Sequence, residues 1–504
     1  MSLNRRRFLN TIASASALYA LKPGLLSAGD KGSGPVKCLI PVSLSKAHKG
    51  TLEIDTQLLD SYGKLPENIR QFYLDARAVL VASPTATLTD RRIVDLAGKA
   101  KLPLISGPML GEVSDTSVVV WFRPVAPGTF TINVTGGVKK AFKVKAAASG
   151  APVRVACDGL KTDVEHHYEI VNEAGAVVGK GAFKTAPAPG SQTTTRIAFG
   201  SCFHKIGVHN PNLMRLVAKR GNHAMLLLGD LAVDDREAKT NMHCSDYLLR
   251  DVSKAWRDLA AGTPVYASWD DHDYLNNDKS GLQKGGISNG QRNALRQIWQ
   301  ENWVNPTTPV NDRGIYFNTR IGDVEVIMLD TRSCRDWKKR GKPGAYLGDA
   351  QKQWLFKTLK ASKATFIVIT SGTMWTDYIS NGKDSWGTWD KATRKEIFTF
   401  LEKNRIGGVL LLSGDRHGAR GFKMQRPSGY TMYEFEAATL GGVPGPGAFG
   451  KDKSAQLFGY KGGLRAFGEF TFDMAKADPT VTFRLIDEHE KPLEEHVIKR
   501  SQLK

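Results

Sequence analysis

The sequence predicts an α/β protein in which a layered domain of sheet and helices, at residues 193–504, follows a small β-sandwich at residues 103–187. Three features predict this. Short apolar runs such as residues 224–228, which ends at Gly229-Asp230, are typical of strands buried on both faces of a parallel sheet. Residues 103–187 instead alternate apolar and polar side chains with a period of two. The 504 residues also exceed what one hydrophobic core normally serves.

The amino terminus has the form of a twin-arginine signal peptide over residues 1–28. Residues 5–9 read RRRFL, an apolar stretch follows at residues 11–21, and small residues end it at Ser27-Ala28. The apolar stretch is too short to span a membrane. We therefore expect export of the folded protein by the twin-arginine machinery to the periplasm or the exterior, with no transmembrane segment in the mature chain.

Residues 29–102 form a mostly helical segment by pattern, because Ile69, Phe72, Tyr73 and Ala76 recur at helical spacing. We predict no chemistry for it beyond packing on a later domain. The sandwich that follows resembles fibronectin/Ig-like domains, since Leu160 and Tyr168 match their Leu…Tyr corner. A Pro- and Ala-rich linker at residues 186–192 separates it from the α/β domain.

Composition excludes some functions and favours others. The formal net charge of +20 comes from scattered Lys and Arg rather than a long basic run, so we expect no nucleic-acid partner. Such a positive field would attract phosphate-bearing substrates or anionic envelope polymers. Five cysteines are too few for a disulfide framework, although one disulfide is compatible with an oxidising compartment.

Four buried strands of the α/β domain end in metal-binding residue types. In chain order these ends carry Cys202 and His204, then Asp230, then Asp271 and His272, then Asp415 and His417. Open α/β sheets place their ligands at the carboxyl ends of strands, so we expect a metal centre along one sheet edge. Carboxylates suit hard cations, while imidazole and thiolate suit zinc or iron. Asp230 is the candidate bridge between two ions, which could together clamp a phosphoryl group.

These residues resemble the PhoD-like alkaline phosphatases of the metallophosphoesterase superfamily. The resemblance covers about residues 195–440 in the family's order. The matching motifs are Gly200-Ser201-Cys202, Leu228-Gly229-Asp230, Trp269-Asp270-Asp271-His272-Asp273 with Asn276-Asn277-Asp278, Leu329-Asp330-Thr331-Arg332, Leu347-Gly348 with Gln351 and Trp354-Leu355, and Ser413-Gly414-Asp415-Arg416-His417.

The resemblance implies a phosphoric ester hydrolase in which a metal-bound hydroxide attacks phosphorus in line. By the same resemblance Cys202 and Asp230 would hold Fe³⁺, with Asp230 bridging to Ca²⁺. The remaining ligands would be Asp271, Asn276 or Asn277, Asp415 and His417. Arg332 would bind the phosphate bidentately, and His272 would protonate the leaving oxygen.

One position departs from the family. The family pattern Gly-Asp-x-x-Tyr puts a tyrosine three residues after Asp230, where this chain has Val233. A phenolate is a good ferric ligand, so Zn²⁺ or Mn²⁺ are alternatives to iron. Our hypothesis is that His204, in the pattern Cys202-x-His204, takes the place of the tyrosine.

Two other functions remain open from the sequence. A phospholipase D-like enzyme, or one that cleaves phosphodiesters of an envelope polymer, could use the aromatic residues between Met374 and Trp389 to line an entry for a bulky substrate. A non-catalytic envelope-binding protein with a degenerate metal site is supported by Val233 but opposed by the four retained Asp and His strand-end residues.

Overall fold

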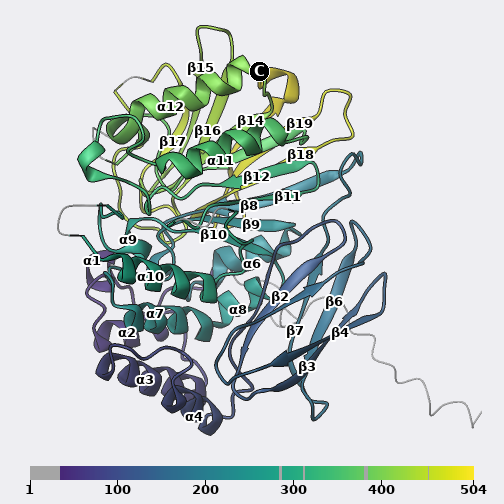
Figure 1. Ribbon diagram of the computed structural model, residues 1–504, viewed down its shortest axis with the longest axis vertical. Coiled ribbons are helices and arrows are strands. Elements are labelled where there is room, and N and C mark those ends of the chain that lie inside the picture. Colours follow the sequence, from purple (N-terminus) through teal and green to yellow (C-terminus); the bar gives the residue numbers. More distant parts are fainter. Residues whose placement is uncertain (1–33, 283–285, 310–312, 380–383, 452) are drawn as a thin grey trace, which may run out of the picture.

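The computed structural model describes residues 34–282, 286–309, 313–379, 384–451 and 453–504. The predicted signal peptide therefore lies outside the described residues. Helices α1 to α4 occupy the segment before the sandwich, and they pack below the large sheets in Figure 1. Their bounds are α1 (Leu44–Ala47), α2 (Leu52–Leu59), α3 (Glu67–Ala82) and α4 (Arg91–Lys99).

The sandwich consists of two antiparallel sheets beside the main domain (Figure 1). One sheet has the order β1 (Leu104–Gly111), β2 (Val118–Pro124), β5 (Val153–Cys157). The other has the order β4 (Lys140–Ala146), β3 (Gly128–Thr135), β6 (Glu165–Val171), β7 (Val177–Lys184). The alternation predicted for the sandwich is visible in β5 of the first sheet and β6 of the second, where every second residue is buried.

The α/β domain contains two mixed sheets instead of one. The first has the order β10 (Val265–Ser268), β9 (Ala224–Leu228), β8 (Thr194–Gly200), β18 (Ala466–Asp473), β19 (Thr480–Asp487), β20 (Pro492–Lys499). The second has the order β11 (Phe317–Ile321), β12 (Val324–Met328), β13 (Phe366–Thr370), β14 (Val409–Ser413), β16 (Thr431–Ala437), β15 (Ala419–Gln425), β17 (Gln456–Tyr460).

The two sheets pack face to face and are covered by helices on their outer faces. Phe435 of the second sheet stacks on Phe483 of the first with ring centroids 4.2 Å apart. The helices outside the first sheet are α5 (His204–Gly207), α6 (Pro211–Lys219), α7 (Thr240–Val252), α8 (Lys254–Ala260), α9 (Asp271–Tyr274) and α10 (Asn289–Asn302). Helices α11 (Gly348–Ala361) and α12 (Trp386–Lys403) cover the second sheet (Figure 1). The layered α/β prediction is confirmed.

The two-sheet arrangement corrects one expectation. Strands β8, β9 and β10 run parallel and end at a common edge, as predicted. The strand before Asp415, however, is β14 of the second sheet. The expectation of a metal centre along the edge of one sheet was therefore wrong. The candidate residues instead gather where the strand ends of two stacked sheets meet.

The tryptophans between Met374 and Trp389 do not line a substrate entry, although the sequence had suggested that they could. Trp375 and the α12 residues Trp386 and Trp389 are buried in the apolar cluster between the second sheet and its helices, and the ring centroids of Trp375 and Trp386 stack 4.7 Å apart. The indole nitrogens of Trp375 and Trp386 donate to Leu412 O and Ser371 Oγ. These tryptophans pack against the second sheet as part of its core. Among the described residues, no helix is both long and apolar enough to cross a membrane.

Candidate metal centre

The strand ends at this junction have backbone conformations that L-residues rarely adopt. Seven non-glycine residues near it have positive φ, and such strain concentrates at functional sites because the surrounding structure must hold it. They are Cys202, His204, Asp230, Asp235, Asp278, Asp415 and His417. Gly229 allows the tight approach of two strand ends, since a Cβ there would lie 2.4 Å from Asp270 Cβ.

Cys202, His204, Asp230 and His417 form one group of ligand atoms. All four offer an atom within 4.8 Å of the others, and the residues come from the ends of β8, β9 and β14. Cys202 Sγ lies 3.6 Å from Asp230 Oδ2, and His204 Nε2 lies 3.5 Å from His417 Nε2. One sulfur, two imidazole nitrogens and one carboxylate are a set that suits iron or zinc.

The other ring nitrogen of each histidine fixes its tautomer. His204 Nδ1 lies 2.8 Å from Asp234 Oδ1, and His417 Nδ1 lies 2.7 Å from Pro444 O. Since the carboxylate and the carbonyl only accept, both Nδ1 atoms carry the hydrogen. The Nε2 atoms of the two rings face each other, and Nε2 is the nitrogen that a histidine with its Nδ1 hydrogen-bonded offers to a metal ion.

A second group shares Asp230 with the first. It consists of Asp230, Asp270, Asp271 and Asp415, whose carboxylate oxygens also lie within 4.8 Å of one another. One oxygen of each of these four carboxyls is buried without a hydrogen-bond partner. Burying carboxylates so close together is costly unless a cation neutralises them. The residues present therefore fit a hard cation such as Ca²⁺ beside the thiolate position, with Asp230 common to both.

The pKa shifts follow from this crowding. Burial, and then the charge of Asp271, hold the pKa of Asp230 well above its usual range. Burial and the charge of Asp270 do the same to Asp415. Burial and Asp230 raise the pKa of the Cys202 thiol. Each group resists ionisation in the bare protein, and a bound cation would reverse that resistance.

Arg332 lies at the centre, where it faces carboxylates. Its side chain is fully buried, and its Nε donates to Asp270 Oδ1 at 2.5 Å. Its terminal nitrogens lie 3.6 Å from Asp271 Oδ1 and 2.7 Å from Asp384 Oδ2. The guanidinium therefore lies beside the carboxylate group, where three ion pairs hold it, and its expected contact with phosphate stays a prediction.

The structure distinguishes the two asparagine candidates and places His272. Asn276 Oδ1 is buried without a hydrogen-bond partner, while Asn277 is exposed and donates to Asp278. His272 follows β10 on α9, and its Nδ1 lies 2.7 Å from Asp235 Oδ1, which leaves Nε2 for other uses.

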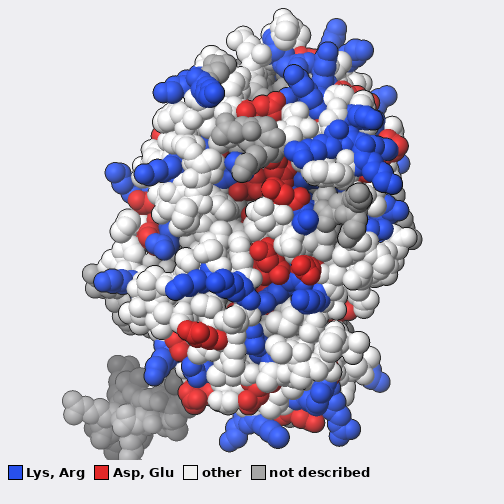
Figure 2. Space-filling model, turned by 90° about the vertical axis from the view of Figure 1, so that its left-hand side faces the viewer, with Lys and Arg blue, Asp and Glu red and all other residues white. Residues whose placement is uncertain are grey.

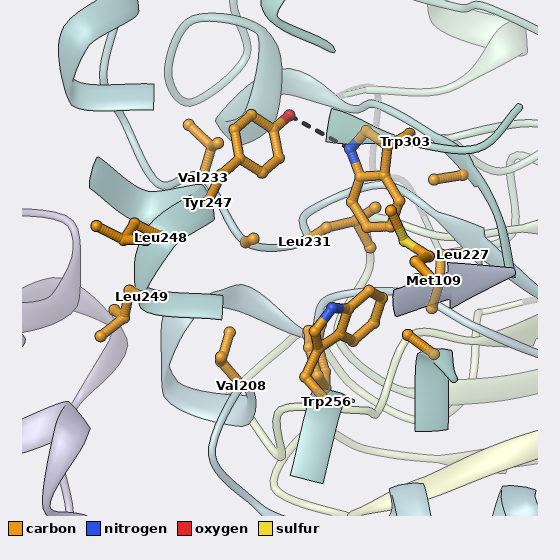
Figure 3. Packing of buried hydrophobic residues seen from close by; sticks show 14 of the residues in the cluster. Met109, Val208, Leu227, Leu231, Val233, Tyr247, Leu248, Leu249, Trp256 and Trp303 are labelled. Atoms are coloured by element: carbon orange, nitrogen blue, oxygen red, sulfur yellow. Dashed lines mark hydrogen bonds between the residues drawn. The ribbon is translucent and has the colours of Figure 1, made fainter. Parts of the chain in front are cut away.

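Position 233 belongs to the core. Val233 is fully buried in the apolar cluster that includes Leu231 and Tyr247, and Figure 3 shows it beside Tyr247. The Tyr247 hydroxyl accepts from Trp303 Nε1 at 3.3 Å and takes no part in the ligand groups. His204 lies with Cys202 in the first ligand group, and its replacement of the tyrosine stays a hypothesis.

Sequence reasoning missed several residues at the centre. Asp270 and Asp384, which face Arg332, are two of them. Asp234 and Asp235 are candidate ligands in the sequence, but acidic residues after a strand favour solvated helix starts, whereas the structure places them against His204 and His272. Asp270 stands in a motif already noted, so adjacency to Asp271 was an available signal. His48, from the helical segment before the sandwich, has its Nε2 3.7 Å from Asp234 Oδ1. No spacing or motif in the sequence predicted that this residue would lie at the centre.

A cavity of about 490 Å³ adjoins this region. It is lined by Cys38, residues 40–45 and His48 of the first segment, by residues 441–444 of the glycine-rich loop and by Arg465, among others. The Pro444 carbonyl that binds His417 is in its wall, so the loop is anchored to the centre. Figure 2 shows Asp and Glu side chains gathered in the middle of the face on which α1 and α9 lie, with Lys and Arg around them.

Comparison with known proteins gives consistent matches. The family model described as PhoD-like phosphatase matches residues 233–458, which include Asp271, Arg332, Asp415 and His417. Alkaline phosphatase D of Bacillus subtilis (strain 168) is 25% identical over 394 residues, which are 63% of this chain and 65% of that protein.

Two solved structures share the fold. A structure of PhoD matches with a TM-score of 0.62 and 20% identity over 79% of this chain and 89% of that one. A purple acid phosphatase from yellow lupin (Lupinus luteus) seeds matches with a TM-score of 0.58 and 11% identity over 78% and 75% of the two chains. Residues 233–458 of this chain thus match the PhoD-like phosphatase model, and that range holds Asp271, Arg332, Asp415 and His417, while Cys202, His204 and Asp230 precede it.

Proposed function

We propose that this chain is a metal-dependent phosphoric ester hydrolase. The observation that carries the proposal is the sharing of Asp230 by two buried ligand groups, one rich in nitrogen and sulfur and one made of carboxylates. A bridging carboxylate between unlike cation positions suits phosphoryl transfer, where two ions act on the attacking and leaving oxygens. The PhoD-like domain supports the same activity.

The ligand types of the two positions support different classes of cation. Cys202, His204, Asp230 and His417 would hold Fe³⁺ or Zn²⁺, while Asp230, Asp270, Asp271, Asp415 and Asn276 would hold Ca²⁺ or Mn²⁺. When bound, such ions lower the pKa of water and neutralise charge on phosphoryl oxygens.

Arg332 has a positioning role in this proposal. Its three carboxylate contacts fix the guanidinium beside Asp270 and Asp271 without any ligand. A cation bound to Asp271 would compete for that carboxylate and leave guanidinium donors for a phosphate oxygen, which Arg recognises bidentately. The phosphate would thereby be oriented between the arginine and the cations.

Hydrolysis of p-nitrophenyl phosphate and of bis-p-nitrophenyl phosphate, before and after chelation, tests the proposal. We expect chelator-sensitive turnover, and the faster substrate assigns preference for monoesters or diesters. Asp230→Asn should abolish turnover and reduce bound metal, while Asp349→Asn, at an exposed site on α11, should change neither. Turnover that survives both chelation and Asp230→Asn would refute a metal-dependent mechanism.

Export by the twin-arginine route is part of the proposal and rests on the sequence of residues 5–28. Fusion of residues 1–33 to a folded reporter tests it. The reporter should leave the cytoplasm, and replacement of Arg5 and Arg6 by Lys should retain it there. Retention of the unaltered fusion would argue against this route.

A further inference from the structure

His48 brings the first helical segment into the metal centre. It follows α1 directly, and its ring stacks on that of His272 with centroids 4.4 Å apart. His48 Nδ1 lies 3.3 Å from Asp235 Oδ2, while His272 Nδ1 lies 2.7 Å from Asp235 Oδ1. One carboxylate therefore holds the same ring nitrogen of both imidazoles.

The opposite nitrogens of the two rings remain available. His48 Nε2 is buried without a hydrogen-bond partner, and it lies 3.7 Å from Asp234 Oδ1. Ligand atoms of His48, Asp234 and His272 lie within 4.8 Å of one another. Tetrahedral zinc holds such atoms about 3.3 Å apart, given bonds of about 2.0 Å, so a small adjustment would bring all three onto one ion.

The backbone around His48 is held firmly in place. Arg77 donates to Gly50 O at 2.7 Å and to Asp55 Oδ2 at 2.7 Å. Asp55 also lies 2.9 Å from Lys205 Nζ, and both side chains are fully buried. Because Lys205 is the neighbour of His204, this ion-pair group ties the first segment to the first ligand group.

We propose that His48, Asp234 and His272 form a further cation position for Zn²⁺. It adjoins the Asp230 positions, because His272 also lies within ligand distance of Asp230 and Asp271, but His48 and Asp234 belong to none of the groups that contain Asp230. Two imidazoles and one carboxylate are ligands that zinc prefers, and the Nδ1 contacts to Asp235 supply the outer support that zinc-bound histidines have. The inference rests on the proposed metal centre. It gives His272 a ligand role in place of the proton transfer expected from the sequence.

Zinc counting on the full mature chain tests the ligand set. Metal-stripped protein is saturated with Ca²⁺, incubated with zinc chloride, desalted and analysed by elemental mass spectrometry. His48→Ala and His272→Ala should each bind one equivalent less than the unaltered chain, or bind it at least about 10-fold more weakly. Lys49→Ala, which removes the exposed neighbouring side chain, should keep the full count.

The same experiment separates the two roles of His272. A proton donor can be removed without loss of metal, so an unchanged zinc count in His272→Ala would overturn the proposal. An unchanged count in His48→Ala would overturn it equally. Should His48→Ala fail to fold, His48→Gln keeps the approximate side-chain volume, and a folded His48→Gln that retains all the zinc gives the same negative result.

A measurement on the unaltered chain needs no variant. Diethyl pyrocarbonate modifies accessible imidazole nitrogens, and mass spectrometry locates the product. Zinc should protect His48 from modification, while the exposed His167 should react equally with and without zinc. Chelator-sensitive hydrolysis with an unprotected His48 would refute only this inference, whereas a chain that binds no metal would refute the proposed centre as well.

Discussion

At the scale of single residues, the histidine at position 204 distinguishes this centre from the family pattern. Its Nδ1 is bonded to Asp234 and its Nε2 faces His417, so the ring is oriented for a ligand role in the group that contains Cys202. Position 233 lies in the apolar core and is occupied by Val, because a larger aromatic side chain would overpack the cluster there.

His204→Ala should remove a ligand from the thiolate position. We expect metal affinity there to fall at least about 10-fold, with a parallel loss of kcat/KM. Elemental analysis and kinetics on the same preparation measure both, and His167→Ala, at an exposed site on the sandwich, is the matched control. Unaltered metal content in His204→Ala would show that the residue does not replace the tyrosine.

Arg332 makes a second prediction at this scale. Arg332→Met leaves Asp270 buried without its cation and Asp384 paired with Arg335 alone, and breaking a buried ion pair in this way costs about 3–5 kcal/mol of unfolding free energy. Arg91→Met removes an exposed pair with Asp95 and should cost no more than about 0.5 kcal/mol. Urea titration of the two variants measures the difference. Equal stabilities would mean that the carboxylates around Arg332 are neutral or hold another cation.

At the scale of elements, the first helical segment is joined to the α/β domain by buried charge as well as by apolar packing. Phe72 and Tyr73 of α3 lie in the same cluster as Tyr247 and Leu248 of α7. Asp55 of α2 contacts Arg77, Lys205 and Arg236, and Arg236 in turn pairs with Asp246. The segment is therefore placed by two independent kinds of contact.

Asp55→Asn tests the ion-pair contribution. The substitution leaves Lys205 and Arg77 buried with one carboxylate fewer, so we expect a loss of about 3 kcal/mol or more in unfolding free energy. Asp60→Asn, just beyond the same helix, breaks a partly exposed pair with Arg70 and should cost about 1 kcal/mol at most. Chemical denaturation compares them. If Asp55→Asn were as mild as Asp60→Asn, apolar packing alone would hold the segment.

Elements also show how far the sequence could lead. Residues 224–228 are buried on both faces because their apolar side chains leave no polar face, so the strand and the carboxylate at its end were predictable. The assignment of β14 to a second sheet was not, since the same apolar run serves either sheet. Trp375 and Trp386 were equally ambiguous, because aromatic side chains suit a core and a binding surface alike.

At the scale of the whole molecule, long-range contacts decide the parts of the centre that no local pattern reveals. His48 and Asp234 are far apart in sequence, and the packing of α1 on α5 and of α3 on α7, with the ion pairs of Asp55, brings them together. The ligand types at the strand ends were visible in the sequence, but their grouping into positions required the stacked sheets.

Three buried histidines outside the ligand groups make the stability of the whole molecule sensitive to acid. Burial lowers the pKa values of His209, His223 and His243 to about 4 each, from an ordinary 6.5. They stay neutral in the folded chain, while the unfolded chain takes up their protons as the pH falls below 6.5. Their contribution is therefore present above pH 6.5 and is lost progressively toward pH 4.

The loss can be assigned to one histidine. Between pH 7.5 and pH 5.0 a shift of this size removes about 2 kcal/mol of unfolding free energy per histidine. His223 Nδ1 accepts from the Arg196 amide, and His223→Asn keeps an acceptor there without a titrating ring. Urea unfolding at the two pH values should show a smaller pH dependence for His223→Asn than for the unaltered chain, whereas His167→Asn, at an exposed position, should leave it unchanged. An identical pH dependence in all three proteins would contradict the prediction, because it would mean that His223 takes up its proton in the folded state as well. The ring would then pair with Asp163, whose carboxylate lies 3.8 Å from Nε2.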